Sequence, residues 1–313
     1  MAKYKVLVTA RSFSSAGREA LDYLWDHGCE VIRLQGGEEE RKHLLPQVDA
    51  VIAGLESYDR AALESAPKLK VISRYGVGYD KVDLSAAKER GIAITITAGA
   101  NENSVADLAV ALMLACARNI PLMNESVKKG TAGRPIGLEM WRKTLGVVGV
   151  GRIGKGVVRR AAGFEMRILC YDMDPDRKFA AQYGAKYVDL DTLIRESDFI
   201  TLHTPYNEKT KNMISERQLQ SMKRSAVLVN TARGGLIDEE ALYRALKDRM
   251  IYAAALDAVA AESSCSSPLC GLGNCILTPH AGATTVDAVC RMSMQAARNA
   301  VDVLETGTCR FSV

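Results

Sequence analysis

Residues 144–172 read TLGVVGVGRIGKGVVRRAAGFEMRILCYD, and this stretch decides the fold class of the chain. An apolar strand predicted at 145–150 runs into a glycine-rich turn, a helical stretch and a second apolar strand at 166–171. The turn has the spacing G-x-G-x-x-G and consists of Gly149, Gly151 and Gly154. The first glycine of such a turn permits a tight bend, the second lets a diphosphate approach the backbone, and the third lets the helix pack closely on the strand. The stretch therefore predicts a dinucleotide-binding βαβ unit.

An acidic residue supports this prediction. Asp172 follows the second strand, 18 residues after Gly154, where a carboxylate can accept hydrogen bonds from the adenosine ribose hydroxyls. The diphosphate would lie on the N–H groups at the positive end of the helix. The glycine spacing alone is weak evidence, because glycine-rich turns occur in many α/β proteins. The complete pattern favours a bound dinucleotide, and because Asp172 would repel a 2′-phosphate, the expected cofactor is NAD.

Short apolar runs alternate with helical patterns along the whole chain, which predicts parallel sheets with helices on both faces. In the first third, strands are expected near 4–9, 30–34, 49–53, 70–73 and 92–96. Later strands are expected near 145–150, 166–171, 186–188, 199–203, 226–231, 251–256 and 275–278. A typical helix is expected within 14–28, with Gly28 at its end. Its apolar face would consist of Ala20, Leu21, Leu24 and Trp25.

Two further helices flank the second set of strands. Residues 101–118 (NENSVADLAVALMLACAR) predict one long, mostly buried helix, and residues 285–305 predict a final helix. The nucleotide motif therefore begins near residue 145 and not near the N-terminus. Two arrangements fit this order: two domains in series, or a nucleotide domain inserted into the first domain. With either arrangement, a cleft between two α/β domains is the expected place for a small-molecule site.

Composition excludes several classes of protein but assigns no function. The 313 residues are enough for two domains, and the apolar fraction of 48% supports sizeable cores. The net charge of +4 comes from 41 basic and 37 acidic residues spread along the chain, so neither nucleic acid nor a membrane surface is expected as a partner. The N-terminal MAKYKVLVTA has no signal-peptide pattern, and no apolar run reaches the ~20 residues of a membrane helix.

The cysteines indicate a reducing compartment. The eight cysteines include no C-x-x-C pair, and several lie in apolar runs, as is typical of free thiols in the cytosol. We therefore expect a cytoplasmic protein. Cys265, Cys270 and Cys275 recur every five residues, which leaves a metal site as an alternative. Zinc sites generally use tighter pairs, often with histidine, so the absence of a metal is the preferred interpretation.

Polar side chains that follow apolar strands are the candidates for chemistry, because the carboxyl ends of parallel strands line the ligand crevice. Of the four histidines, His27 and His43 lie in polar helical contexts. His203 and His280 each follow a strand beside a Thr-Pro pair. Arg233, in LVNTARGGLID, follows another strand and precedes two glycines, so its guanidinium could meet a planar carboxylate.

Two acidic residues complete the set of candidates. Asp257 ends the strand IYAAALDA, and Glu262 lies five residues later. Each candidate also has a structural interpretation: a buried imidazole for either histidine, a surface arginine, and solvated loop carboxylates. The residues taken singly do not decide between these interpretations.

Three longer motifs follow the glycine turn in order, namely NTARGGLIDEEAL, AAALDAVAAES and LTPHAGATT. In sequence and spacing they resemble the NAD-dependent D-2-hydroxyacid dehydrogenase family, and its phosphoglycerate dehydrogenase-like branch in particular. The similarity extends from KVISRYGVGYD at 70–80 to about residue 295. The resemblance implies the inserted arrangement: a flavodoxin-like substrate domain of residues 1–100 and 285–313, and a Rossmann NAD-binding domain of residues 101–284.

The resemblance also implies roles for individual residues. The catalytic trio would be Arg233, Glu262 and His280, with His203 a structural or cofactor-side residue. Cofactor contacts would come from Gly149, Gly151, Arg152, Ile153, Gly154, Asp172, Thr204, Thr231, Arg233, Asp257, His280 and Gly282. Asp257 would face the nicotinamide. The substrate carboxylate would be held by Arg233 and by backbone N–H groups of Tyr75, Gly76, Val77 and Gly78.

Two departures from the family pattern bear on the site. Where the family usually reads D-V-F-x-x-E-P, residues 257–263 read DAVAAES, without the aromatic and proline residues that stiffen the loop. Phosphoglycerate dehydrogenases typically have an arginine near the position of Glu56. A carboxylate there would repel a phosphate dianion, and Arg74 and Lys81 are the alternative cations. We therefore expect that 3-phosphoglycerate is not the best substrate.

The expected function is that of an NAD-dependent oxidoreductase for a D-2-hydroxy acid and its 2-oxo acid, similar to phosphoglycerate dehydrogenase. A glyoxylate, hydroxypyruvate or other short 2-oxo acid reductase is the alternative within that class. An NAD-sensing binding protein, like the corepressors that resemble this family, is the alternative from another class. The very apolar segment 105–117, continued by Ile120, Leu122 and Met123, predicts a homodimer joined mainly through the nucleotide domain.

Overall fold

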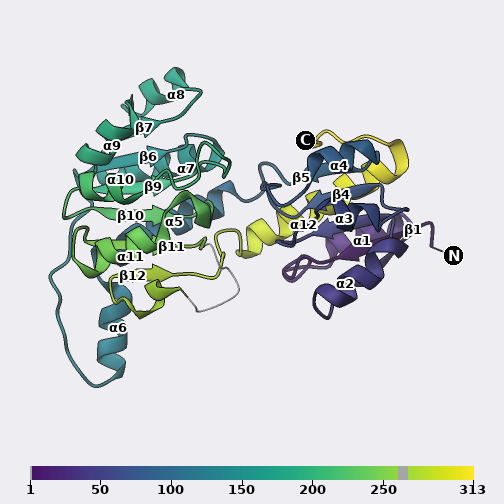
Figure 1. Ribbon diagram of the computed structural model, residues 1–313, viewed down its shortest axis with the longest axis horizontal. Coiled ribbons are helices and arrows are strands. Elements are labelled where there is room, and N and C mark those ends of the chain that lie inside the picture. Colours follow the sequence, from purple (N-terminus) through teal and green to yellow (C-terminus); the bar gives the residue numbers. More distant parts are fainter. Residues whose placement is uncertain (1, 260–266) are drawn as a thin grey trace. The chain divides into compact units, whose positions relative to one another are not determined.

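The computed structural model describes residues 2–259 and 267–313. Two units, each built on its own parallel sheet, are formed by Met1–Asn101 with Ala283–Val313 (unit 1) and by Glu102–Gly282 (unit 2) (Figure 1). The chain leaves unit 1 once and returns to it with its last helix, α12 (Val286–Thr306). Strands and helices alternate in both units, which confirms the predicted α/β class with two doubly wound parallel sheets.

Unit 1 contains a five-stranded parallel sheet in the order β2-β1-β3-β4-β5. Its strands are β1 (Tyr4–Val8), β2 (Cys29–Arg33), β3 (Ala50–Ala53), β4 (Val71–Arg74) and β5 (Ala93–Ile96). Successive side chains of a strand point to opposite faces, so strands covered on both faces are apolar throughout. In β1, Val6 and Val8 join one core cluster and Leu7 joins the other. Both faces of this sheet are therefore buried.

Helices cover the two faces of the unit 1 sheet. The helix α1 (Glu19–Asp26) and α12 pack on the face that carries Val6 and Val8. The opposite face is covered by α2 (Glu38–Leu44), the 3-10 helix η1 (Leu45–Gln47), α3 (Arg60–Glu64) and α4 (Leu84–Glu89).

The first helix differs from its prediction. It begins at Glu19 and not near residue 14, because the chain turns at Ser14, which has a positive φ of 56°. Ala20 and Leu24 are buried as expected, but Trp25 is 46% exposed, so the apolar face is narrower than predicted. Gly28 follows the helix with φ of 74°, the left-handed conformation expected of a glycine at a helix end.

Unit 2 contains a seven-stranded parallel sheet in the order β12-β11-β10-β9-β6-β7-β8. Its strands are β6 (Thr144–Val148), β7 (Arg167–Tyr171), β8 (Lys186–Tyr187), β9 (Phe199–Leu202), β10 (Val227–Asn230), β11 (Ala253–Leu256) and β12 (Cys275–Leu277). One face is covered by α5 (Glu102–Ala117), α7 (Arg152–Ala161) and α8 (Arg177–Gln182). The other is covered by α9 (Leu190–Glu196), α10 (Glu216–Ser221) and α11 (Glu239–Lys247).

The helices α5 and α6 (Ile120–Lys128) have opposite environments. The predicted long helix is α5, which packs on α7, β10 and β11. By contrast, α6 has no buried residue. Among the described residues, no single helix is long and apolar enough to cross a membrane; only α5 and α6 together pass a test of length and composition, and they are bent by 62°.

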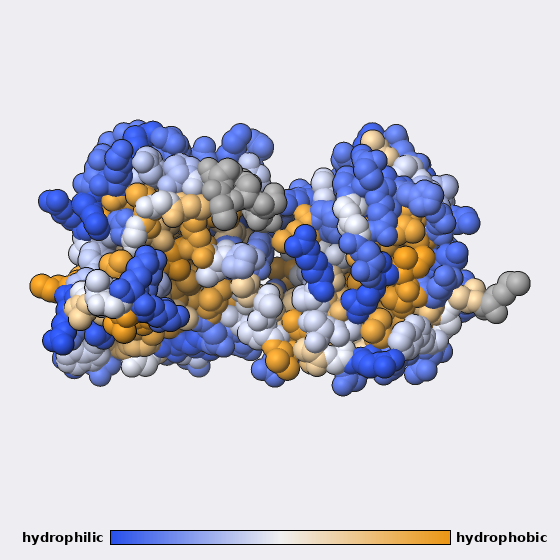
Figure 2. Space-filling view, turned by 90° about the horizontal axis from the view of Figure 1, so that it is seen from below, coloured by the Kyte–Doolittle hydropathy of each residue, from blue (hydrophilic) through white to orange (hydrophobic). Residues whose placement is uncertain are grey.

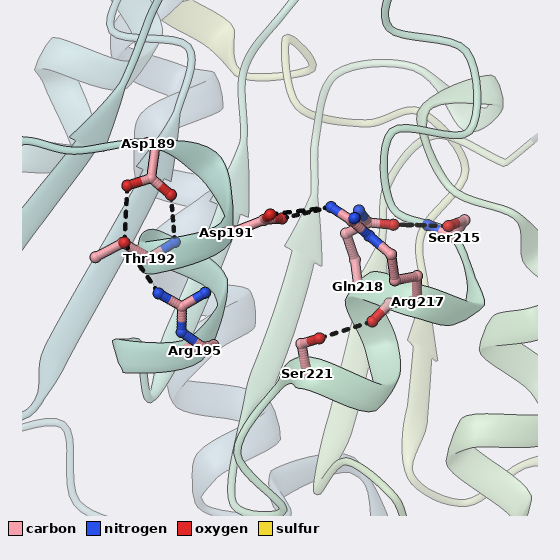
Figure 3. A network of polar contacts seen from close by, with 8 residues as sticks. All are labelled: Asp189, Asp191, Thr192, Arg195, Ser215, Arg217, Gln218 and Ser221. Atoms are coloured by element: carbon pink, nitrogen blue, oxygen red, sulfur yellow. Dashed lines mark hydrogen bonds and ion pairs between the residues drawn. The ribbon is translucent and has the colours of Figure 1, made fainter.

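A network of polar contacts joins α9 to α10 (Figure 3). Asp189 caps α9 by accepting a hydrogen bond from the Thr192 amide at 2.8 Å, and Arg217 of α10 donates to Asp191 at 2.8 Å. At the start of α10, the Ser215 hydroxyl donates to Gln218 at 2.6 Å. Exposed ion pairs contribute at most about 1 kcal/mol each, so the apolar face of these helices provides most of the stability and the network fixes their ends.

Each sheet has one point at which the strand order reverses. In unit 1 it lies between β1 and β3, and in unit 2 between β6 and β9. The loops that leave the carboxyl ends of two such strands run to opposite sides of the sheet, and a crevice opens between them, which is where open α/β sheets bind ligands. Each unit therefore has its own candidate ligand position.

Candidate functional site

The glycine turn of unit 2 lies at the reversal point between β6 and β9. Gly149 has φ of 88°, and a Cβ atom there would lie 2.6 Å from the backbone of His203 at the end of β9. A Cβ atom on Gly154 would lie 2.1 Å from the carbonyl oxygen of Gly149, whereas one on Gly151 would meet nothing within 4 Å. The first and third glycines are thus required by close backbone packing. The second leaves open space beside the start of α7, which is the space a diphosphate needs.

The surroundings of this turn also fit a dinucleotide. Gly151 is the N-cap of α7 and provides no side-chain acceptor, so the N–H groups of the first turn, which includes Arg152 and Ile153, are available to an anion. Asp172 follows β7 and accepts hydrogen bonds from the amides of Val150 at 2.6 Å and Asp174 at 2.9 Å. Its carboxylate therefore lies against the glycine turn, where a ribose hydroxyl would need it.

His203 lies in the loop after β9, and its contacts indicate a structural role. Its Nε2 is 2.9 Å from the Thr201 hydroxyl, and its Nδ1 is 3.3 Å from the hydroxyl of Thr231. Burial lowers the pKa of His203 from 6.5 to about 3, so the ring is neutral at physiological pH. A neutral imidazole with both nitrogens beside threonine hydroxyls is suited to holding the loops after β9 and β10 together. Thr204 and Thr231, predicted to line the cofactor, belong to the same two loops.

Asn230 holds the loop that carries Arg233. Its side-chain nitrogen Nδ2 donates to the carbonyl oxygen of Arg233 at 2.7 Å, and its side-chain oxygen Oδ1 accepts from the backbone amide of Ala232 at 3.0 Å. The guanidinium of Arg233 itself donates to the Ala232 carbonyl at 2.8 Å. The loop continues into the short 3-10 helix η3 (Gly234–Leu236). Sequence reasoning missed Asn230, although a polar residue at the end of an apolar strand was the available signal.

Asp257 holds the loop that carries His280. It is buried, and its carboxylate accepts three hydrogen bonds, from the Thr278 hydroxyl at 2.6 Å, the Ala281 amide at 2.7 Å and the Gly282 amide at 2.8 Å. Between these anchors, His280 has a φ of 54°, which is strained for a residue with a side chain. Strained residues held firmly by their surroundings are concentrated at functional sites. The described contacts of Asp257 thus position His280, and its predicted contact with the nicotinamide stays a prediction.

Glu262, the remaining member of the predicted trio, lies outside the described residues, as does Cys265. Among the residues that the structure describes, no group of three His, Cys, Asp or Glu side chains is arranged to hold a metal ion. The described cysteines are free thiols: Cys29, Cys116, Cys170, Cys270, Cys275, Cys290 and Cys309. The other two histidines differ from each other, since His43 is exposed but His27 lies against the Tyr23 ring and within 2.8 Å of its carbonyl oxygen.

The predicted carboxylate-binding loop of unit 1 follows β4. The amide of Tyr75 donates to the Ala53 carbonyl at 2.9 Å, and the amide of Gly76 donates to the Thr97 hydroxyl at 2.8 Å. Those two N–H groups are therefore already used within unit 1, and the prediction narrows to the amides of Val77 and Gly78. The Tyr75 hydroxyl is 3.2 Å from the Ser293 hydroxyl of α12, so this side chain anchors the loop to the scaffold.

Comparison with known proteins places these features in a family. Residues 110–282, which cover most of unit 2, match the NAD-binding domain of the D-isomer specific 2-hydroxyacid dehydrogenases. The chain is 40% identical over 290 residues to a D-3-phosphoglycerate dehydrogenase of Archaeoglobus fulgidus, an alignment that covers 91% of this chain and 55% of that protein. It is 39% identical over 302 residues to a hydroxypyruvate reductase of Thermotoga maritima, covering 94% of this chain and 96% of that one.

A solved structure agrees over the full length. The crystal structure of a glyoxylate reductase from Paecilomyes thermophila is similar with a TM-score of 0.88 at 30% identity, covering 100% of this chain and 99% of that chain. The chain spans only about half the length of the phosphoglycerate dehydrogenase that it matches. It matches the hydroxypyruvate reductase and the glyoxylate reductase almost from end to end.

Proposed function

The chain belongs to the D-isomer specific 2-hydroxyacid dehydrogenase family, and from that membership we propose that it interconverts a D-2-hydroxy acid and its 2-oxo acid with NAD. The glycine turn and Asp172 of unit 2 provide the residues that would hold the dinucleotide. The observation that carries the proposal is the position of His280, on a strained loop fixed by the buried Asp257 at the carboxyl edge of the same sheet.

The proposed chemistry divides the work among three side chains. His280 removes the hydroxyl proton of the 2-hydroxy acid, and in the opposite direction it returns a proton to the carbonyl oxygen. Arg233 holds the substrate carboxylate with its planar guanidinium, assisted by the amides of Val77 and Gly78. Glu262 orients His280 and stabilises the imidazolium that forms when His280 takes the proton. NAD, when bound, supplies the hydride acceptor and donor.

A short 2-oxo acid is the proposed substrate class. In unit 1, Glu56 follows β3 where a phosphate-binding arginine would be needed by a phosphorylated substrate. This acidic residue favours a hydroxypyruvate or glyoxylate reductase over a phosphoglycerate dehydrogenase.

The test is turnover. Purified protein is mixed with NADH and a panel of 2-oxo acids, and NADH oxidation is followed. An enzyme oxidises NADH with at least one of them, whereas an NAD-sensing binding protein binds NADH without turnover. His280→Ala should lose about 10²- to 10⁴-fold in kcat while still binding NADH. A larger loss for His203→Ala than for His280→Ala would show that the wrong histidine has been assigned.

A homodimer in the cytoplasm is the proposed form of the protein. Apolar side chains reach the surface of both units (Figure 2). In unit 2 they include α6 and the segment after it, with exposed fractions of 49% for Ile120, 44% for Leu122, 68% for Val127, 92% for Ile136 and 51% for Trp141. An exposed apolar helix followed by an exposed apolar segment is typical of an interface with a second copy of the chain. Light scattering should give twice the mass of 34.0 kDa at micromolar concentration, and a monomer would refute the proposal.

A further inference from the structure

The reversal point of the unit 1 sheet carries an acidic group that the proposed reaction does not use. The loops after β1 and β3 meet there: the Gly54 amide donates to the Thr9 hydroxyl at 3.1 Å, and a Cβ atom on Gly54 would lie 3.3 Å from the Cα atom of Ala10. Glu56 follows two residues after Gly54. Because ligands of flavodoxin-like sheets bind at this β1/β3 position, the side chains of these loops are candidates for ligand contacts.

The carboxylate of Glu56 lies over its own loop. Its two oxygens would lie 2.9 and 3.3 Å from a Cβ atom on Gly54. The oxygen Oε2 is buried and has no hydrogen-bond partner among the residues that the structure describes. A buried carboxylate oxygen without a donor is unfavourable, by an amount that a hydrogen bond from a ligand would recover. The side chain is thus prepared for a donor that the described part of the chain does not provide.

Arg74 joins this loop to the predicted carboxylate-binding loop. It is the last residue of β4, it is 95% buried, and its guanidinium donates to the carbonyl oxygen of Gly54 and, at 3.0 Å from Nε, to that of Gly78. The strand pairing places Arg74 beside Ala53 of β3. One buried side chain therefore fixes the Glu56 loop beside the amides proposed to hold the substrate carboxylate.

The nearby charges restrict what the Glu56 carboxylate can accept. Tyr58, two residues on, is fully buried, and burial together with the Glu56 charge raises the pKa of its phenol, which therefore stays neutral. The guanidinium of Arg74 is already turned to two carbonyl oxygens. A phosphate or second carboxylate on the substrate would face the negative charge of Glu56, whereas a hydroxyl group would donate a hydrogen bond to it.

We propose that Glu56 is the specificity-determining residue of this enzyme and selects 2-oxo and 2-hydroxy acids that carry an uncharged hydrogen-bond donor on C3, of which hydroxypyruvate and D-glycerate are the simplest. The inference rests on the proposed function, because the ligand at this position is taken to be the substrate. Glyoxylate has no C3 atom, pyruvate has a methyl group there, and 3-phosphohydroxypyruvate has a dianionic substituent. These compounds therefore report separately on the donor and on the charge.

The experiment compares kcat/KM for these four 2-oxo acids with NADH in the wild type and in two Glu56 variants. The wild type should prefer hydroxypyruvate to pyruvate by at least about 10-fold, the value of one hydrogen bond to a charged acceptor. Glu56→Ala should bring that ratio to within a few-fold of one. Glu56→Gln, which keeps an acceptor oxygen without the charge, should retain part of the hydroxypyruvate preference and improve the use of 3-phosphohydroxypyruvate relative to hydroxypyruvate.

The matched control is Glu64→Ala, an exposed carboxylate on α3 of the same unit, which should leave every substrate ratio unchanged. NADH affinity and thermal melting show whether each variant is folded. An unchanged ratio of hydroxypyruvate to pyruvate in Glu56→Ala overturns the inference while leaving the proposed function standing. Failure of the wild type to reduce any 2-oxo acid refutes the proposed function, and the inference falls with it.

Discussion

Replacing Asp257 with asparagine is expected to destabilise unit 2 and to slow turnover through the position of His280. The buried carboxylate accepts hydrogen bonds at 2.6, 2.7 and 2.8 Å from Thr278, Ala281 and Gly282. Asparagine has one carbonyl oxygen and one NH₂ group. One of the two acceptor positions therefore becomes a donor, although the size of the side chain is nearly unchanged.

The structure gives the magnitude of the effect. In the less disruptive orientation, the asparagine oxygen replaces Oδ1 and keeps the bonds from Thr278 and Ala281, while its NH₂ group faces the amide of Gly282. A hydrogen bond to a charged group contributes about 1.5–3 kcal/mol. Loss of one such bond and weakening of two others should lower the free energy of unfolding by about 2–4 kcal/mol. The left-handed backbone of His280 costs about 1–3 kcal/mol and persists because these bonds hold it, so it should relax and misplace the imidazole.

The assay combines urea denaturation with NADH binding and 2-oxo acid turnover. In Asp257→Asn the unfolding midpoint and kcat should both fall, with a smaller change in NADH affinity, because the glycine turn and Asp172 are not altered. Asp248→Asn, an exposed aspartate after α11 in the same unit, is the control and should change none of these quantities. If Asp257→Asn unfolds at the wild-type urea concentration and turns over at the wild-type rate, Asp257 does not position His280.

Gly154→Ala should destabilise unit 2, because its Cβ atom would lie 2.1 Å from a backbone oxygen. Gly151→Ala, whose Cβ atom would meet nothing within 4 Å, should keep the wild-type melting temperature and weaken NADH binding. Equal melting temperatures of the two variants would contradict this. Burial lowers the pKa of His203 to about 3, so between about pH 6.5 and 3 the unfolded chain binds a proton that the folded chain does not. The free energy of unfolding should therefore decrease as the pH is lowered through that window. In His203→Gln this pH dependence should be weaker. The ratio of kcat/KM for NADH over NADPH should exceed one and fall in Asp172→Ser; equal use of both cofactors by the wild type would refute the role of Asp172. Arg233→Lys should raise the KM of the 2-oxo acid with little change in NADH affinity, because lysine lacks the planar fork, and an unaltered KM would remove Arg233 from the substrate site.

The cofactor half of the fold could be predicted because its rules are local in sequence. Gly154 is required by the carbonyl oxygen of Gly149 in the same βαβ unit and Gly149 by the loop after the neighbouring strand, while Gly151 leaves open space. The position of Asp172 could be predicted because it directly follows the second strand of that unit. The start of α1 at Glu19 could not be predicted in this way, because Ser14 takes a positive φ and its amide donates to the hydroxyl of Ser293, 279 residues away. Local propensity contains no information about such a partner.

The roles of Asn230 and Asp257 could not be assigned from the sequence, because their position allows two interpretations. Both are polar residues at the ends of apolar strands, and that position marks them equally as ligand contacts or as scaffold. Only the hydrogen bonds decide: Asn230 fixes the backbone of the Arg233 loop, and Asp257 fixes that of the His280 loop. Arg233 and His280 thus each depend on a buried neighbour: Asn230 acts three residues before Arg233, whereas Asp257 reaches the His280 loop from the neighbouring strand.

The ligand positions at the two reversal points are formed by different parts of the chain. The cofactor position at the unit 2 reversal point is made mainly of backbone, which tolerates no side chain at Gly149 or Gly154 and is therefore visible as a spacing. The corresponding position in unit 1 is made of side chains, Glu56 and the bridging Arg74, whose neighbours are set by the order of the strands. A change at Glu56 alters charge without requiring any backbone to move, whereas a change in the glycine turn does not have that freedom. If Glu56 and His280 have the roles proposed for them, single substitutions in unit 1 can change the substrate preference while the cofactor and the proton-transfer residues of unit 2 stay the same.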